Sequence, residues 1–460
     1  MMKKSIVIVA LLLLLSLCLP SCSSVYDDPS VITTEPLIEV DEAKECFTTG
    51  YLYTKTQMEG SFVYGDSWIY VESCPYKTVY EGDNGVNYNV DEIQRIVKMN
   101  AKTGVVSSAC LDPVCNHSPG SDCLMLLPLD GTMLNLQRLI GDWIVFSHVR
   151  VIDGATVNET YIYNLKTGEV VTPFETQSDG LKLTKWSSIF DVGNTIYRVK
   201  NYLDYSKTGY DPNGQKPMAL YKPETKSWLY SYDLDTGKSE ELFEIPANYT
   251  VTAVSNMRYF FTSREEGSIY SCDYEGNNFK KEEVLDFSPV YLCGPYAYSF
   301  AEEGLKIYDV ASDSMKTVPI EFASYAGYVT EAGALICSFT TCDEWMALDE
   351  KTFADAHPEI PLMEQTLAWS EELNKIMYKG SAQIWSIDLE GKEKKLFFEK
   401  EHCFIRIQHA SGDYVFAIIT YGDPQNDFAM LPEENDGRSV INLKTGEITA
   451  IPYLEVVKTE

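Results

Sequence analysis

Residues 256–276 read NMRYFFTSREEGSIYSCDYEG and contain the pattern that decides the fold. The first part is a turn followed by an apolar strand, and the second part is an apolar strand that ends in a turn with glycine. Glycine supplies the positive φ that tight hairpins require, so the stretch predicts paired antiparallel strands.

Both parts of this pattern recur along the chain. The first part starts eight times, at Gly65, Gly141, Gly193, Asn256, Gly294, Gly333, Asn374 and Gly412. The second part follows each time, starting at Ile96, Tyr161, Leu229, Ile269, Ile307, Trp345, Ile384 and Ser439. From residue 256 onward, successive starts of the first part lie 38, 39, 41 and 38 residues apart.

A unit of about 40 residues with four short strands is typical of a β-propeller blade. We therefore predict an all-β fold, a single β-propeller of eight four-stranded blades over residues 46–460. Seven blades are the alternative, if the first and last units share strands and residues 46–55 supply the strand that closes the ring. No helix is expected after the first 21 residues, because no helical period of useful length follows them.

The start of the chain has the pattern of an export signal. Lys3 and Lys4 precede an almost wholly apolar stretch, residues 6–19, which is too short for a confident membrane-spanning helix. Leu19-Pro20-Ser21-Cys22 follows and resembles the lipobox of bacterial lipoproteins. The alternative is an ordinary signal peptide that is cut nearby.

The lipobox resemblance implies a lipid anchor. Residues 1–21 would be a lipoprotein signal peptide, and Cys22 would carry a diacylglyceryl thioether and an N-linked acyl chain such as palmitate. Residues 22–45 would form a flexible tether. The protein would then be extracytoplasmic and anchored to the bacterial cell membrane, or to the outer membrane of a source that has one.

A second resemblance lies in the repeats. Tyr259-Phe-Phe-Thr and the strand and turn that follow it resemble the YWTD repeat of lipoprotein-receptor propellers, and the unit around Met377 and residues 384–391 is similar. The resemblance implies an LRP-like propeller of the kind found on bacterial surface proteins. Much of that group has no assigned activity, so the resemblance implies a fold and a location rather than a reaction.

The charge balance of the chain argues against strongly anionic ligands. The sequence has 37 basic and 68 acidic residues, which gives a formal net charge of −31. Such a chain repels nucleic acids and anionic lipid head groups, so neither is expected as a ligand. A solvated acidic surface is the simplest reading of the charge.

Candidate ligand-binding residues lie in the longest loops. The two parts of the pattern start 31, 36 and 27 residues apart in units one, three and eight, but only 10 to 13 residues apart in units four to seven. Extra chain at this position belongs to loops between the second and third strands of a blade, which share one face. The predicted ligand residues there are Tyr76, Tyr80, Tyr88, Tyr202, Tyr205, Tyr210, Asp211, Tyr421 and Asp423. Packing of these tyrosines onto the propeller is an equally good interpretation.

One segment is rich in metal-ligand side chains. Cys110, Cys115, His117 and Cys123 have the spacing C-x4-C-x-H-x5-C. Three thiolates and an imidazole could complete a tetrahedral structural zinc site. A disulfide between two of the cysteines is the other main interpretation, because exported proteins meet oxidising conditions. The sequence leaves both open, and it places the segment on the long-loop face, between the last strand of unit one and the first of unit two.

These features favour a binding protein. The sequence has no G-x-S-x-G and no H-E-x-x-H motif, and no catalytic residue can be nominated. We predict a membrane-anchored recognition lipoprotein whose long Tyr- and Asp-rich loops bind a carbohydrate, a peptide or a protein. The alternative function is a membrane-tethered enzyme that degrades polysaccharides or peptides at the propeller mouth.

Overall fold

The fold is described by a computed structural model. It describes residues 44–48, 53–54, 61–82, 85–100, 104–115, 117, 121–128, 131–152, 155–212, 216, 220–301, 303–320, 324–330, 333–411, 413–431 and 437–452. The predicted signal peptide, Cys22 and residues 22–43 of the predicted tether lie outside the described residues.

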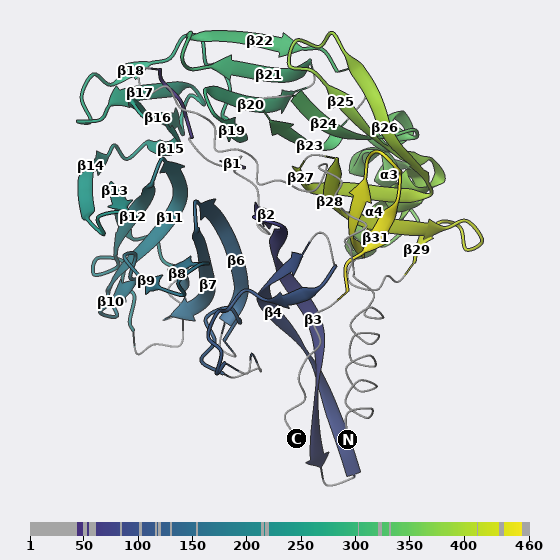
Figure 1. The fold of residues 1–460 in the computed structure, drawn as a ribbon, viewed down its shortest axis with the longest axis horizontal. Helices are drawn as coiled ribbons and strands as arrows, with labels where there is room; N and C mark the ends of the chain where they lie inside the picture. The colour runs from purple at the N-terminus through teal and green to yellow at the C-terminus, as the bar shows by residue number, and fades with distance from the viewer. Residues whose placement is uncertain are drawn as a thin grey trace, which may run out of the picture.

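The described strands form seven antiparallel sheets arranged in a ring (Figure 1). Blade 1 contains β2 (Ser61–Tyr64), β3 (Ser67–Gly82), β4 (Gly85–Asn100) and β5 (Val106–Ser108). Blade 2 contains β6 (Gly131–Ile140), β7 (Trp143–Ile152), β8 (Ala155–Asn164) and β9 (Val170–Val171). Blade 3 contains β11 (Lys182–Val192), β12 (Thr195–Asp204), β13 (Glu224–Asp233) and β14 (Ser239–Ile245), with the short β10 (Gln177–Ser178) beside β11.

The remaining four blades follow in chain order. Blade 4 contains β15 (Tyr249–Val254), β16 (Arg258–Ser263), β17 (Ile269–Asp273) and β18 (Lys280–Lys281). Blade 5 contains β19 (Tyr291–Cys293), β20 (Tyr296–Ala301), β21 (Gly304–Asp309) and β22 (Ser314–Val318). Blade 6 contains β23 (Ser324–Thr330), β24 (Gly333–Phe339), β25 (Ser381–Ile387) and β26 (Lys394–Glu401). Blade 7 contains β27 (Cys403–Ser411), β28 (Tyr414–Asp423), β30 (Arg438–Asn442) and β31 (Ile448–Ala450), with β29 (Ala429–Met430) paired to β28.

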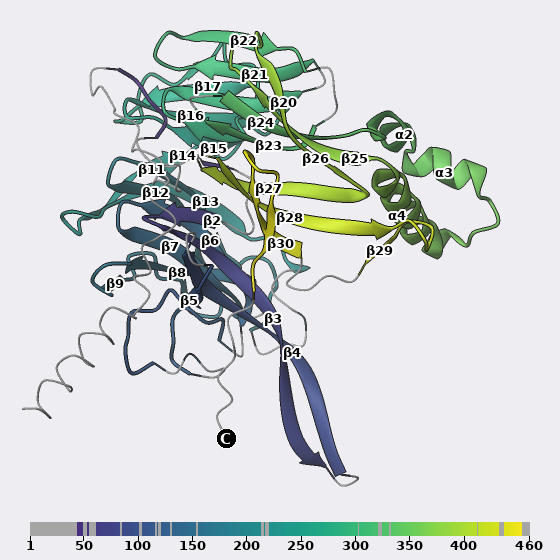
Figure 2. The same ribbon diagram turned by 45° about the vertical axis from the view of Figure 1, so that its right-hand side comes forward.

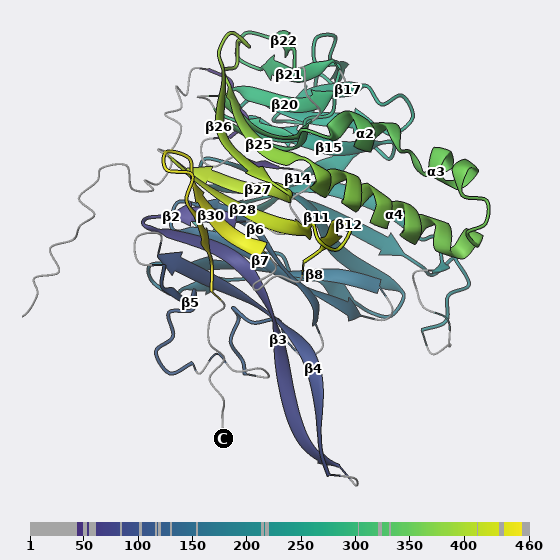
Figure 3. The same ribbon diagram turned by 90° about the vertical axis from the view of Figure 1, so that its right-hand side faces the viewer.

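The four principal strands of each blade are called a to d, and strand a lies nearest the centre of the ring (Figure 1). Because neighbouring strands are antiparallel, all a–b and c–d connections leave one side of the ring, here called the a–b side. All b–c connections leave the opposite side, the b–c side. Figure 3 shows the ring from its edge, with the helices on the b–c side.

The prediction of a single all-β propeller is confirmed, but the count of eight blades is wrong and the alternative of seven holds. Predicted units six and seven are one blade. Strand β24, which starts at Gly333, pairs with β25, which contains Ile384. The two intervening matches, at Trp345 and Asn374, lie in helices.

The expectation of no helix is also wrong. Between β24 and β25 lie α2 (Cys342–Ala347), α3 (Glu350–Ala356) and α4 (Leu362–Lys379). Asp349 caps α3 by accepting a hydrogen bond from the backbone N–H of Thr352, and Pro361 precedes α4. Within the described part of the chain, none of the helices combines the length and apolar character needed to cross a membrane.

The core lies between neighbouring blades as a series of apolar clusters. Inner strands of adjacent blades are in contact, and β2 contacts β27 where the ring closes. There Trp68 and Tyr70 of blade 1 pack against Phe416 of blade 7, with ring centroids 5.1 and 5.4 Å apart. The first and last blades are therefore joined by aromatic packing, and each forms its principal sheet from its own segment of chain.

Residues 44–48 pack against the a–b side of the ring. The amide N–H of Cys46 donates to the side chain of Asn256 at 2.9 Å, and the N–H of Asn256 donates back to the Cys46 carbonyl at 2.9 Å. Glu45 accepts hydrogen bonds from the guanidinium Nε of Arg258 at 2.9 and 3.1 Å. Since Asn256 lies in the a–b turn of blade 4, the chain meets the ring on this side.

The same segment also has its own hydrophobic anchor. Phe47 is buried against Phe260 and Tyr308, with ring centroids 5.3 and 6.3 Å apart. The next residue, Thr48, donates to the buried carboxylate of Asp191 in blade 3 at 3.3 Å. Residues 44–48 thus contact three blades and add to the central core.

Strand β1 (Tyr53–Thr54) pairs with β19, the inner strand of blade 5. Residues 46–55 were expected to supply a strand that closes the ring between the first and last blades. The described part of this segment instead lies against blades 3, 4 and 5, because ring closure is already satisfied by the packing of Trp68 and Phe416.

Replacing Phe47 with alanine is expected to lower the free energy of unfolding by about 3–5 kcal/mol, because a buried aromatic ring leaves a cavity between blades 4 and 5. Urea denaturation followed by tryptophan fluorescence measures the loss. Met257→Ala, in the adjacent exposed turn, is the matched control and should change stability by no more than about 0.5 kcal/mol. Equal stability of the two variants would show that residues 44–48 add nothing to the fold.

His409 predicts a pH dependence of stability. Burial lowers the pKa of His409 to about 3, and the ring packs edge-on against Trp68 at 5.7 Å. In the unfolded chain a histidine takes up a proton below about pH 6.5, so stability falls as the pH drops from there towards 3. Between pH 6.5 and 4.5, wild type should lose up to about 1.4 kcal/mol per pH unit more than His409→Gln. Parallel pH profiles of the two proteins would disprove the assignment.

Candidate functional site

The b–c side carries the long insertions of this fold (Figure 2). Strands β3 and β4 extend beyond the ring as a hairpin of 16 residues per strand. Residues 205–223 separate β12 from β13, and residues 424–437 separate β28 from β30. The largest insertion is residues 340–380 in blade 6, here called the helical insert. The sequence predicted long loops in blades 1, 3 and 7 and missed the helical insert.

Hydrogen bonds hold the helical insert together. The indole Nε1 of Trp369 donates to the carbonyl of Leu348 at 2.8 Å, which ties α4 to the segment after α2. The hydroxyl of Thr366 donates to Glu350 in α3 at 2.7 Å. At the base, the hydroxyl of Thr341 donates to the carbonyl of Ile376 at 2.9 Å. These bonds connect the three helices into one structural unit.

The insert also contacts blade 7. Lys375 of α4 forms an ion pair with Asp427 at 2.9 Å, and the hydroxyls of Tyr378 and Thr420 are 3.0 Å apart. Met377 and Tyr378 are buried at the end of α4 next to the propeller. The first turns of α4 are therefore held away from the ring while its last turn is fixed to it (Figure 3).

The outer end of the helical insert is apolar and exposed. Leu362 is 82% exposed, Met363 97% and Leu367 65%. Met363 and Leu367 lie four residues apart and so share one face of α4. We call Leu362, Met363 and Leu367 the apolar tip. Large side chains exposed together in this way mark interaction surfaces rather than ordinary solvent-facing helix.

Acidic residues surround the apolar tip. Residues 340–380 contain nine acidic and three basic residues: Asp343, Glu344, Asp349, Glu350, Asp355, Glu359, Glu364, Glu371, Glu372, Lys351, Lys375 and Lys379. Asp355, Glu359 and Glu364 are exposed in the segments next to Leu362 and Met363. The surface that the insert offers to a partner is therefore apolar at its tip and negative around it.

Three of the predicted ligand tyrosines lie on the hairpin of blade 1. Tyr76, Tyr80 and Tyr88 lie on β3 and β4, and their side chains lie outside the described residues. Tyr202 of β12 donates to Glu241 at 2.7 Å, and Lys200 stands over its ring at 4.9 Å. Tyr202 therefore belongs to a polar ladder on blade 3.

The tyrosines of the blade 3 loop pack inward. Tyr205 is buried with Val157, and the rings of Tyr210 and Tyr221 pack in series against it at centroid distances of 5.7 and 5.3 Å. Asp211 is exposed beside this cluster. The structure thus brings these residues together as packing of the loop, the interpretation that the sequence left open beside ligand binding.

Tyr421 and Asp423 lie at the end of β28 in blade 7. Asp423 accepts the backbone N–H of Gln425 at 2.8 Å and so stabilises its own turn. Tyr421 lines a hollow of about 500 Å³ together with Lys400, Ile419 and Ser439.

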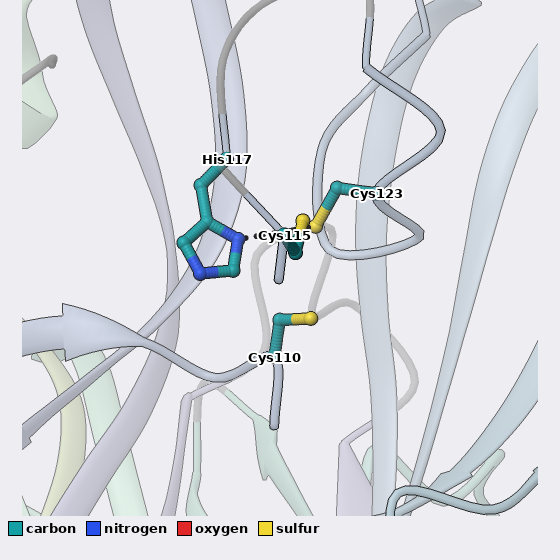
Figure 4. A group of neighbouring side chains, drawn as sticks. All are labelled: Cys110, Cys115, His117 and Cys123. Atoms are coloured by element: carbon teal, nitrogen blue, oxygen red, sulfur yellow. Dashed lines mark hydrogen bonds between the residues drawn. The ribbon is translucent and has the colours of Figure 1, made fainter. Parts of the chain in front are cut away.

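The structure brings together the four residues of the cysteine and histidine motif (Figure 4). The ligand atoms of Cys110, Cys115, His117 and Cys123 all lie within 4.8 Å of one another. Sγ of Cys123 is 3.5 Å from Nδ1 of His117. All three thiols are free, and a cavity of about 620 Å³ lies beside them.

Burial governs the protonation of this cluster. Burial raises the pKa of the Cys110 and Cys123 thiols above the usual range, and backbone N–H groups that donate to the sulfurs lower it in part. Burial also lowers the pKa of His117. The imidazole is thereby kept in the neutral form that can offer a lone pair, as a metal ligand must.

The location of the cluster differs from the one expected on the long-loop face. Residues 125–127 resume the outer edge of blade 1 beyond β5, because Ile96 donates to the carbonyl of Met125 at 2.8 Å and Leu127 to that of Gln94 at 2.9 Å. Residues 110–124 are therefore an excursion within strand d. The backbone N–H of Leu111 reaches the hydroxyl of Tyr163 in blade 2 at 2.8 Å.

The excursion ends close to the c–d turn of blade 2. Thr167 and Gly168 of that turn line the cavity beside the cysteines. On the far end of the excursion, Nε2 of His148 lies 2.9 Å from the carbonyl of Leu124. The cluster consequently lies at the rim between blades 1 and 2, towards the a–b side of the ring.

Comparison with known proteins shows a likeness of fold alone. No protein-family model and no curated protein matches the sequence. The propeller domain of the trilobed protease from Pyrococcus furiosus is 13% identical, with a TM-score of 0.42, and covers 89% of this chain and 100% of its own. Acylaminoacyl peptidase from Pyrococcus horikoshii is 12% identical with a TM-score of 0.41.

The peptidase is much the longer protein. The match covers 83% of this chain but 53% of the peptidase, so the chain spans about half its length. Dipeptidyl peptidase 4 from Porphyromonas gingivalis is 10% identical with a TM-score of 0.37, over 85% of this chain and 51% of its own. The seven-bladed fold of this chain is established by its strand pairing.

Tyr205→Ala is expected to lower the free energy of unfolding by about 3 kcal/mol, because the buried ring supports the stack of Tyr210 and Tyr221. Tyr202→Ala is the matched control, because Tyr202 lies on β12 and Tyr205 directly follows that strand. It should change the free energy of unfolding by less than about 1 kcal/mol, since Tyr202 belongs to the polar ladder on the surface. Thermal denaturation measures both. A Tyr205 variant as stable as wild type would show that this stack does not support the fold.

Proposed function

We propose that this protein is a lipid-anchored extracytoplasmic recognition protein that binds a polypeptide with the apolar tip of its helical insert. The observation that carries the proposal is the exposure of Leu362, Met363 and Leu367 together on α4. Burying such side chains against a partner stabilises a complex by about 1.5–3 kcal/mol each. The last turn of α4 is fixed to the propeller, which limits the freedom that the tip loses on binding.

Charge narrows the kind of partner. The tip is surrounded by Asp355, Glu359 and Glu364 on a chain of net charge −31. A complementary polypeptide presents apolar side chains flanked by lysine or arginine, which speeds association and fixes orientation. A neutral carbohydrate would gain no attraction from the carboxylates around the apolar tip, and an acidic peptide would be repelled by them.

The path of the chain supports an anchored arrangement. Residue 44 meets the ring on the a–b side, where the side-chain amide of Asn256 donates to the Lys44 carbonyl at 3.0 Å. A lipid on Cys22 would be joined to this side by residues 22–43, which reach at most roughly 75 Å when extended. The helical insert leaves the opposite side, so the apolar tip would point away from the membrane.

The test is binding of a synthetic amphipathic peptide with leucines on one face and lysines on the other, measured by fluorescence anisotropy. The double variant Met363→Asp/Leu367→Asp is expected to weaken binding by about ten- to a hundredfold, because the apolar contact is lost. A peptide of the same composition in scrambled order should bind weakly to wild type.

The added carboxylates separate the proposal from general attraction between opposite charges. If the peptide were held by charge alone, the double variant would bind it as well or more tightly, and the proposal would be wrong. Val105→Asp is the matched control, since Val105 is 61% exposed in the c–d turn of blade 1. It adds a carboxylate far from the tip and should leave binding unchanged.

A further inference from the structure

We propose that Cys110, Cys115, His117 and Cys123 bind one zinc ion in a closed, tetrahedral structural site that joins blade 1 to blade 2. This inference is independent of the recognition function, because the cluster lies on the rim and the apolar tip lies on the b–c side. The sequence alone left a zinc site and a disulfide as alternatives for these residues, and the structure favours the zinc site.

The ligand separations fit the size of the ion. Zinc–sulfur bonds of about 2.3 Å in a tetrahedron place neighbouring ligand atoms roughly 3.5–3.8 Å apart. The four ligand atoms lie within 4.8 Å of one another, and the pair Cys123 Sγ and His117 Nδ1 is 3.5 Å apart. Figure 4 shows the side chains converging from both arms of the excursion.

Backbone N–H groups donate to two of the sulfurs. The N–H of Asp112 donates to Sγ of Cys110, and the N–H of Met125 donates to Sγ of Cys123. In both cases the donor lies two residues after the cysteine, so a local turn aims it at the sulfur. Outer hydrogen bonds of this kind hold metal ligands in place.

His117 provides a distinction from a disulfide. Its φ of 51° lies in the left-handed region, which a residue with a side chain occupies at a cost. That conformation brings its imidazole to the sulfurs. A disulfide would use two of the three cysteines and would leave the third cysteine and this imidazole with no role at the centre.

The place of the site in the fold explains what the metal would do. Residues 110–124 interrupt strand d of blade 1, and apolar contacts hold them only in part. A metal that joins Cys110, at the start of the excursion, to Cys123, at its end, restores the continuity of the strand. It also holds Leu111 against Tyr163 of blade 2. With all four positions filled by protein, the ion has no open position for catalysis.

The experiment measures metal content of the full-length purified protein and its spectrum after substitution with cobalt. Mass spectrometry of the metal is expected to find about one zinc per chain. The cobalt form should show the visible bands and sulfur-to-metal charge-transfer bands of a tetrahedral site with three thiolates. Removal of zinc with a strong chelator should lower the melting temperature, and added zinc should restore it.

Variants make the ligand assignment specific. Cys123→Ser and His117→Ala should lose the stoichiometric metal, while His117→Cys should retain it by supplying a fourth sulfur. Cys272→Ser, a buried cysteine in blade 4, is the matched control and should keep one zinc per chain. Because the metal ratio and the cobalt spectrum are measured on wild type, poor folding of a variant leaves the test intact.

Any of three results would overturn the proposal. The first is a metal-free wild-type protein in which thiol titration and peptide mapping reveal a disulfide within the cluster. The second is a metal-free wild-type protein with three reactive thiols and a melting temperature that neither chelator nor zinc changes. Zinc retained fully in Cys123→Ser would equally remove the site from these residues.

Discussion

The antiparallel pairing of strands within each blade is the constraint on which the arrangement of this molecule depends. Four strands that alternate in direction send every b–c connection to one side of the ring and every a–b and c–d connection to the other. Insertions can lengthen any connection, but they cannot change its side. The helical insert and the β3–β4 hairpin therefore share a side, although the hairpin ends at Asn100 and the insert begins at residue 340.

Ring closure shows how a repeated fold tolerates unequal repeats. Blades 1 and 7 share no principal strand, and Trp68, Tyr70 and Phe416 supply the contact between them. Aromatic packing of this kind needs only complementary faces, so each blade can change its loops without disturbing the closure. Residues 44–48 reinforce the opposite half of the ring, where Phe47 fills the space between blades 4 and 5.

The sequence was sufficient for the fold class because turn and strand chemistry repeats at even spacing. It was insufficient for the blade count, because Asn374-Lys-Ile-Met-Tyr resembles a turn and strand but belongs to α4. The signals of that helix were present in Asp349, Pro361 and the apolar residues four apart at 363 and 367. Even spacing concealed them, since an insertion of about 40 residues has the length of a blade.

For the candidate sites, too, the sequence predicted some features and missed others. Local chemistry identified the four residues of the cysteine and histidine cluster, because all of them lie within 14 residues of chain. The position of the cluster on the rim could not be predicted from neighbouring sequence. It depends on the pairing of residues 125–127 with β4 after the excursion. The inward packing of Tyr205 depends on a neighbouring blade in the same way. Chemistry that is short-range in sequence is thus predictable, whereas the side on which it acts follows from long-range pairing.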